Sequence, residues 1–202
     1  MNTVTSETQL CNLALAEIGQ MRITSLDEAS AAAQAANRLY APVRDHVLSL
    51  RPWGFAMKRA VLTQLETGPV YGFDHYYALP GDYLRMVDFN DVSAESARPT
   101  FLREGTYLAT NEDEVFIRYV RRETDTSKFD ALFVSAFATI LASKLTPHIT
   151  GDWGLANELL GRFAGMSLTE ASTADAMTDK PNQGRHGRMS RFAMARFGGN
   201  VG

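Results

Sequence analysis

The residues that could do chemistry are few and do not form a known catalytic pattern. Carboxylates are the main candidates, because Asp82, Asp88, Asp91, Glu95 and Glu104 all lie in the middle of the chain. Two carboxylates cleave glycosidic bonds when a fold holds them at a defined separation. Several of these acids lie beside turn-forming residues, where an acidic side chain commonly only contacts water. A carbohydrate hydrolase using Asp82 or Glu104 is therefore kept as an alternative function.

Nucleophiles and metal ligands are equally sparse. The chain has one cysteine, Cys11, and four histidines that lie far apart in the sequence. Cys11 stands beside Leu10 and Leu13 in an apolar pattern of helical spacing, so we expect a buried, unreactive thiol. One cysteine excludes an internal disulfide and the multi-cysteine metal sites. We therefore predict that the protein is not an enzyme and has no catalytic residue, cofactor or metal ion.

The composition is typical of a globular protein with an uneven distribution of charge. The chain has 202 residues, of which 45% are hydrophobic and 21% charged, and its net charge is −3. Residues 180–202 contain five basic residues and no acidic one, whereas the preceding residues contain 15 basic and 23 acidic ones, a net charge of −8. The sequence thus predicts an acidic body with a basic C-terminal arm.

No membrane segment or export signal is expected from the sequence. The N-terminus lacks a basic leader followed by an apolar run. The longest apolar stretch, 131–145, is interrupted by polar residues and is too short to cross a bilayer. We expect a cytoplasmic protein without membrane contact.

The basic arm, residues 179–202, alternates arginines with large apolar side chains. Its predicted partner-binding residues are Arg185, Arg188, Arg191, Phe192, Met194, Arg196 and Phe197. Arginines and aromatic residues supply much of the binding energy at protein interfaces. The acidic body argues against nucleic-acid binding, because phosphates require a basic face. We predict an extended arm that orders on a protein partner; a monomeric protein-interaction module that uses this arm is a second alternative function.

Residues 1–66 have helical periodicity. Thr5 or Ser6 is expected to cap a first helix that stops at Gly19. Ser25 and Glu28 have the spacing of a capping box, which predicts the start of a second, alanine-rich helix.

Residues 67–125 change to an alternating pattern rich in aromatic and β-branched residues. We expect four or five short antiparallel strands in a small sheet or barrel. Residues 126–178 return to helical spacing, with one helix starting at Thr126 or Ser127 and another after Pro147 and Gly151. The predicted fold is α+β: a helical bundle built from 1–66 and 126–178, with a β-rich insertion at 67–125.

Three segments of the chain resemble a known family. They are Arg51-Pro52-Trp53-Gly54-Phe55-Ala56, Tyr77-Ala78-Leu79-Pro80-Gly81-Asp82-Tyr83-Leu84-Arg85, and Arg118-Tyr119-Val120 with the following helix from Phe129 to Leu145. In their order and spacing, over about 5–170, they resemble the head-to-tail adaptor (connector) proteins of tailed phages, also called the tail tubular protein A family.

The resemblance implies a structural protein without catalytic residues. Such adaptors form a ring, typically a dodecamer, between the portal protein and the tail tube or nozzle, and double-stranded DNA passes through the lumen. The implied partners are therefore the portal protein, the tail tube or nozzle protein, further copies of the chain, and DNA in transit only. The implied location is the neck and tail of the virion, after assembly in the host cytoplasm. An acidic body suits a conduit that does not retain DNA, and the basic arm suits docking on the portal or on a neighbour.

Overall fold

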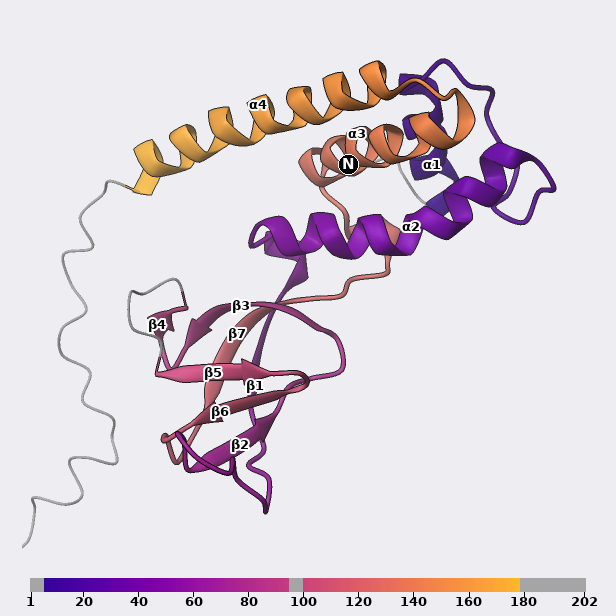
Figure 1. The fold of residues 1–202 in the computed structure, drawn as a ribbon. Coiled ribbons are helices and arrows are strands. Elements are labelled where there is room, and N and C mark those ends of the chain that lie inside the picture. The colour runs from indigo at the N-terminus through magenta and orange to yellow at the C-terminus, as the bar shows by residue number, and fades with distance from the viewer. Residues whose placement is uncertain (1–5, 95–99, 179–202) are drawn as a thin grey trace, which may run out of the picture. The chain divides into compact units, whose positions relative to one another are not determined.

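The computed structural model describes residues 6–94 and 100–178, with side chains described up to residue 165. The chain divides into two units after Phe163, and all contacts discussed below lie within the first unit. The structure is 45% helical and 21% strand, with helices at both ends of the described chain and antiparallel strands between them (Figure 1). The predicted α+β fold is thus confirmed.

The first two helices begin at serine residues. Helix α1 (Glu7–Glu17) starts after Ser6, whose hydroxyl accepts the Gln9 amide at 3.2 Å, and Gly19 follows its end with φ +67°. Helix α2 (Ala31–Leu50) starts after Ser30, whose hydroxyl accepts the amide of Ala33 at 3.2 Å. The predicted capping box is therefore wrong.

The two residues of that predicted box instead form turns before α2. Glu28 accepts the backbone amide of Thr24 at 2.9 Å, and the Ser25 hydroxyl accepts the Asp27 amide at 3.0 Å. Both are turn interactions that compete with helix capping for the same side chains.

The remaining helices come after the strands in the chain. Helix α3 (Ala131–Ile149) starts after Asp130, which accepts the Phe133 amide at 2.7 Å, and the predicted start at Thr126 is a short 3₁₀ turn, η2 (Thr126–Lys128). Pro147 lies within the last turn of α3, so it does not mark the end of that helix. Helix α4 spans Trp153–Thr178.

Among the described residues, one helix, α3, is long and apolar enough to cross a membrane. From the sequence, the apolar stretch at 131–145 was expected to be too short, but the helix continues to Ile149. Of its 18-residue apolar window, 67% is buried inside the protein. This degree of burial is typical of the core helix of a soluble bundle.

The strands form two small antiparallel sheets. Their bounds are β1 (Met57–Val61), β2 (His75–Ala78), β3 (Tyr83–Phe89), β4 (Val92–Ser93), β5 (Phe101–Glu104), β6 (Tyr107–Thr110) and β7 (Phe116–Arg121), with a 3₁₀ turn, η1 (Gly54–Ala56), before β1. The sheet orders are β1-β7-β3-β4 and β2-β6-β5. Strand β1 lies inside the region that the sequence assigned to the helical bundle, because it pairs along its whole length with β7, far downstream.

Strand β7 contributes to both hydrophobic cores. Ile117 and Tyr119 point into the core between the two sheets, together with Leu62, Tyr77, Phe89, Leu108 and Val115. Val120, on the opposite face of the strand, belongs to the helical core with Phe133 and Phe137 of α3. Since successive side chains of a strand point to opposite faces, this strand joins the helical layer to the sheets.

Candidate functional site

The three segments that carry the family resemblance meet where the helices join the sheets. In the first segment, the indole Nε1 of Trp53 donates to the carbonyl oxygen of Val47 at 2.8 Å, which satisfies a free carbonyl in the last turn of α2. The rings of Trp53 and Phe55 pack on Phe133 of α3, with centroids 5.2 and 5.3 Å apart. This segment therefore joins the end of α2 to α3.

The second segment also binds the end of α2. The guanidinium of Arg85, on β3, donates to the carbonyl oxygens of Leu50 and Ser49 at 2.8 and 3.3 Å. A cation beside the carbonyls of a helix C-terminus interacts favourably with the helix dipole. Arg85 therefore attaches the sheet to the helical layer.

The second and third segments meet at Asp82. Its carboxylate accepts a hydrogen bond from the Tyr119 hydroxyl at 2.8 Å and pairs with Lys58 of β1 at 3.0 Å. The Tyr83 and Tyr119 rings stack with centroids 5.7 Å apart. Burial opposes ionisation of Asp82, but the contacts from Tyr119 and Lys58 outweigh it and hold the pKa of Asp82 below its usual value. Conversely, burial and the bond to Asp82 raise the pKa of Tyr119.

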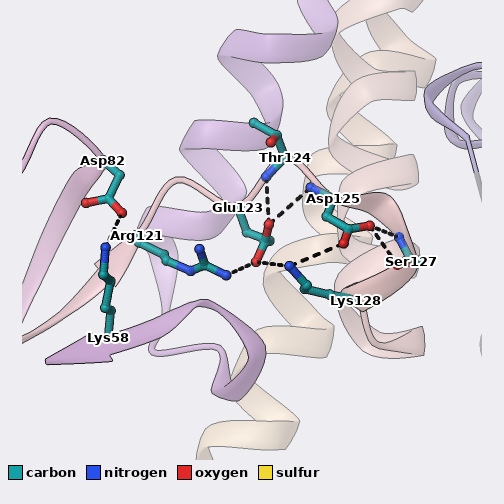
Figure 2. A network of polar contacts seen from close by, with 8 residues as sticks. All are labelled: Lys58, Asp82, Arg121, Glu123, Thr124, Asp125, Ser127 and Lys128. Carbon is teal, nitrogen blue, oxygen red and sulfur yellow. Dashed lines mark hydrogen bonds and ion pairs between the residues drawn. The ribbon is translucent and has the colours of Figure 1, made fainter.

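A polar network centred on Glu123 occupies the connection from β7 to α3 (Figure 2). One carboxylate oxygen of Glu123 accepts the backbone amides of Thr124 and Asp125, both at 3.1 Å. The other pairs with Arg121 and, at 3.4 Å, with Lys128. The carboxylate of a buried glutamate is thereby fully satisfied, as burial of a charge requires.

The end of β7 is tied to α2 as well. Arg122 pairs with Asp45 through Nε and Oδ2 at 2.6 Å, and Arg44 donates to the other oxygen of Asp45 at 3.0 and 2.9 Å. Together with the Arg85 contacts, these ion pairs attach β3 and the end of β7 to α2.

Three of the carboxylates considered for hydrolysis, Asp82, Asp88 and Glu104, have structural partners. Asp88 pairs with Arg118, and Glu104 accepts a hydrogen bond from Tyr76. Asp82, with a lowered pKa, is a poor general acid, since that role requires a raised pKa. Glu95 lies outside the described residues.

The predicted burial of Cys11 is confirmed. Its side chain is fully buried in α1, and burial, with a smaller effect of Glu7, raises the pKa of the thiol to about 12. Among the described residues, no group of three histidine, cysteine or acidic side chains is placed to hold a metal ion.

A hollow on the outer face of the four-stranded sheet was not predicted from the sequence. It has a volume of about 310 Å³ and includes Arg59 and Val61 of β1, Phe116 and Arg118 of β7, and Asp88 of β3. We call this feature the sheet groove. Its sequence signal was the alternation along 115–120, which places Phe116 on the face opposite the buried Ile117.

The seven partner-binding residues predicted in the arm (Arg185, Arg188, Arg191, Phe192, Met194, Arg196 and Phe197) lie outside the described residues, so their role stays a prediction. No protein-family model matches the chain, and no curated protein matches its sequence significantly.

Proposed function

We propose that the protein is a head-to-tail adaptor of a tailed phage, which forms a ring between the portal and the tail and gives passage to DNA. The observation that carries this proposal is the convergence of the three family-like segments. Trp53 and Phe55 pack on α3, Arg85 binds the end of α2, and Asp82 binds Tyr119. The similarity therefore concerns residues with one shared structural task, the attachment of an inserted sheet to a helical layer.

Such a construction supports a structural role. The polar side chains at the junction are engaged by backbone groups and by one another, as at Glu123 (Figure 2) and at Asp45. Buried polar networks that are fully satisfied favour one packing arrangement over others. A ring subunit under the force of DNA passage benefits from a junction of this kind.

The charge distribution gives each part of the adaptor a task. The acidic body does not attract the DNA backbone, whereas the arm brings arginines and aromatic residues to a protein partner. In this proposal the arm docks on the portal or on a neighbouring subunit.

Size-exclusion chromatography with light scattering, with and without portal rings, tests the proposal. We expect the protein to join the portal rings in a fixed stoichiometry. Assembly only on the portal agrees with the proposal, since binding to a template stabilises the assembled state. A chain that stays monomeric in the presence of folded portal rings would contradict it.

Deletion of residues 180–202 tests the arm separately. We expect loss of portal attachment while circular dichroism and the unfolding midpoint of the body stay unchanged. Attachment at unchanged affinity would show that the arm has another role.

A further inference from the structure

The sheet groove is the uncovered half of a sheet face whose other half is buried. Strands β1 and β7 pair in the register Met57–Val120, Arg59–Arg118 and Val61–Phe116. Val120 and Met57 pack in the helical core. Farther along the same face, Val61 and Phe116 are 68% and 48% exposed. A cross-strand pair of large apolar side chains in solvent is typical of a surface that a partner covers.

One charged side chain of the groove, Arg59, is not neutralised by a neighbour in the described part of the chain. Arg59 lies directly opposite Arg118, and Arg118 lies opposite Asp88 on its other side. Asp88 pairs with Arg118, whereas the guanidinium of Arg59 has no side-chain partner among the described residues. Like charges facing each other across strands destabilise a sheet. A carboxylate beside Arg59 would remove this repulsion.

A loop elsewhere in the same chain has the complementary features. Residues 66–74, which join β1 to β2, carry Val70 and Tyr71 at their tip, 100% and 89% exposed. Glu66 and Asp74 flank this tip, and no basic residue lies between them. The loop thus offers two large apolar side chains and two negative charges.

The base of this loop is fixed by tight backbone packing. A Cβ atom on Gly68 would lie 2.4 Å from the carbonyl oxygen of Asp74, so only glycine allows this approach. The amide of Asp74 also donates to the Asn111 side chain at 2.9 Å, and the Leu65 amide donates to the Tyr76 carbonyl at 2.8 Å. A loop with a fixed base loses less conformational entropy on binding than a flexible loop, which favours its use as a binding element.

We propose that the loop of residues 66–74 of one copy docks in the sheet groove of a second copy. Val70 and Tyr71 cover Val61 and Phe116, and a carboxylate that flanks the tip pairs with Arg59. Loop and groove are different surfaces, so the contact is heterologous, and repetition of such a contact builds a ring when the rotation closes. The inference names the contact between neighbouring subunits of the proposed adaptor. Only the closure of these contacts into a ring rests on the proposed function; the contact itself does not.

Site-directed cross-linking tests the contact, because the sole native cysteine is buried and does not interfere. V70C and V61C proteins are mixed, with and without portal rings, and oxidised. We expect disulfide-linked dimers in the mixture, and a ladder of higher oligomers from a chain that carries both substitutions. V70C mixed with M21C is the matched control, because Met21 lies in a loop of the helical layer and is more exposed than Val61, at 88% against 68%. It should give at least tenfold less product.

A charge exchange adds an independent readout. We expect R59E to reduce the cross-linked fraction at least fivefold, and E66R or D74R to restore it in the R59E chain. Circular dichroism checks that each variant is folded, and R59K should behave as wild type.

The outcomes separate this inference from the proposed function. Chains that join portal rings but do not link V70C to V61C would overturn the contact and leave the adaptor proposal standing. A disulfide ladder from chains that never join portal rings would support the contact and contradict the adaptor proposal. Linkage of V61C to the portal protein, or equal linkage of V70C to M21C, would also overturn the contact.

Discussion

Removal of the Glu123 side chain should strongly destabilise the connection between β7 and α3. The Glu123 side chain is 4% exposed, whereas those of Arg121 and Lys128 are 29% and 47% exposed. E123A leaves the amides of Thr124 and Asp125 without their acceptor (Figure 2). A hydrogen bond to a charged group contributes roughly 1.5–3 kcal/mol. The two partly exposed cations can return to water, so their pairs contribute about 0–1 kcal/mol each.

The two amide bonds together account for about 3–6 kcal/mol. Both bonds are only partly buried, so the freed amides can regain water, and we expect E123A to lower the free energy of unfolding by about 3–4 kcal/mol. This value lies at the lower end of the range for breaking a buried ion pair. E123Q keeps an acceptor oxygen for both amides but loses the charge and the second acceptor oxygen, which pairs with Arg121 and Lys128. We therefore expect it to cost about half as much as E123A.

Urea denaturation, followed by circular dichroism and extrapolated to water, measures these changes. The matched control is D113N, because the Asp113 side chain is 99% exposed and its removal should change stability by less than about 0.5 kcal/mol. An E123A protein as stable as D113N would refute the reasoning. An E123Q protein as unstable as E123A would show that the charge, and not the bonds to the amides, holds the connection.

Three further perturbations give distinct outcomes. W53F removes the hydrogen bond to the Val47 carbonyl and should lower the stability measured by thermal unfolding by about 1–3 kcal/mol. W153F, at an exposed position, should change stability very little, and equal effects of the two substitutions would show that the Trp53 hydrogen bond does not stabilise the end of α2. Cys11 should resist a thiol reagent in the native protein and react stoichiometrically in denaturant, because its thiol is buried and its pKa is raised; rapid labelling of the native chain would contradict this. D82N should be less stable than wild type by about 1–2 kcal/mol at pH 7. Since the pKa of Asp82 is lowered in the folded state, its carboxylate stabilises the protein above about pH 4, and this stabilisation is lost as the pH falls further. The stability difference between wild type and D82N should therefore shrink at about pH 3, and a difference independent of pH would refute this role of the carboxylate.

Much of the helical structure was predictable because helix ends depend on neighbouring residues. Ser6 caps α1 as expected, and Gly19, in the left-handed region, follows its end. The capping box at Ser25 and Glu28 was wrong for an equally local reason: several residues before α2 can cap, and Ser30 is used. Choosing among such candidates depends on which turn the preceding loop forms.

Strand pairing was less accessible to sequence reasoning. The residues of β1 lie directly after the end of α2 and carry little alternation, so only their partner β7 makes them a strand. The predicted role of the seven arm residues remains untested, because they lie outside the described residues.

The sequence by itself determined the α+β order of helices and strands, the buried thiol of Cys11, and the division into an acidic body and a basic arm. These properties depend on periodicity and composition, which the chain carries locally. Only the tertiary structure brought the three family-like segments to one junction and placed Arg59, Phe116 and Val61 on one uncovered face. The physical reason is that register and the packing of layers are set by contacts between residues far apart in the chain, and no local pattern encodes which half of a sheet face the helices cover.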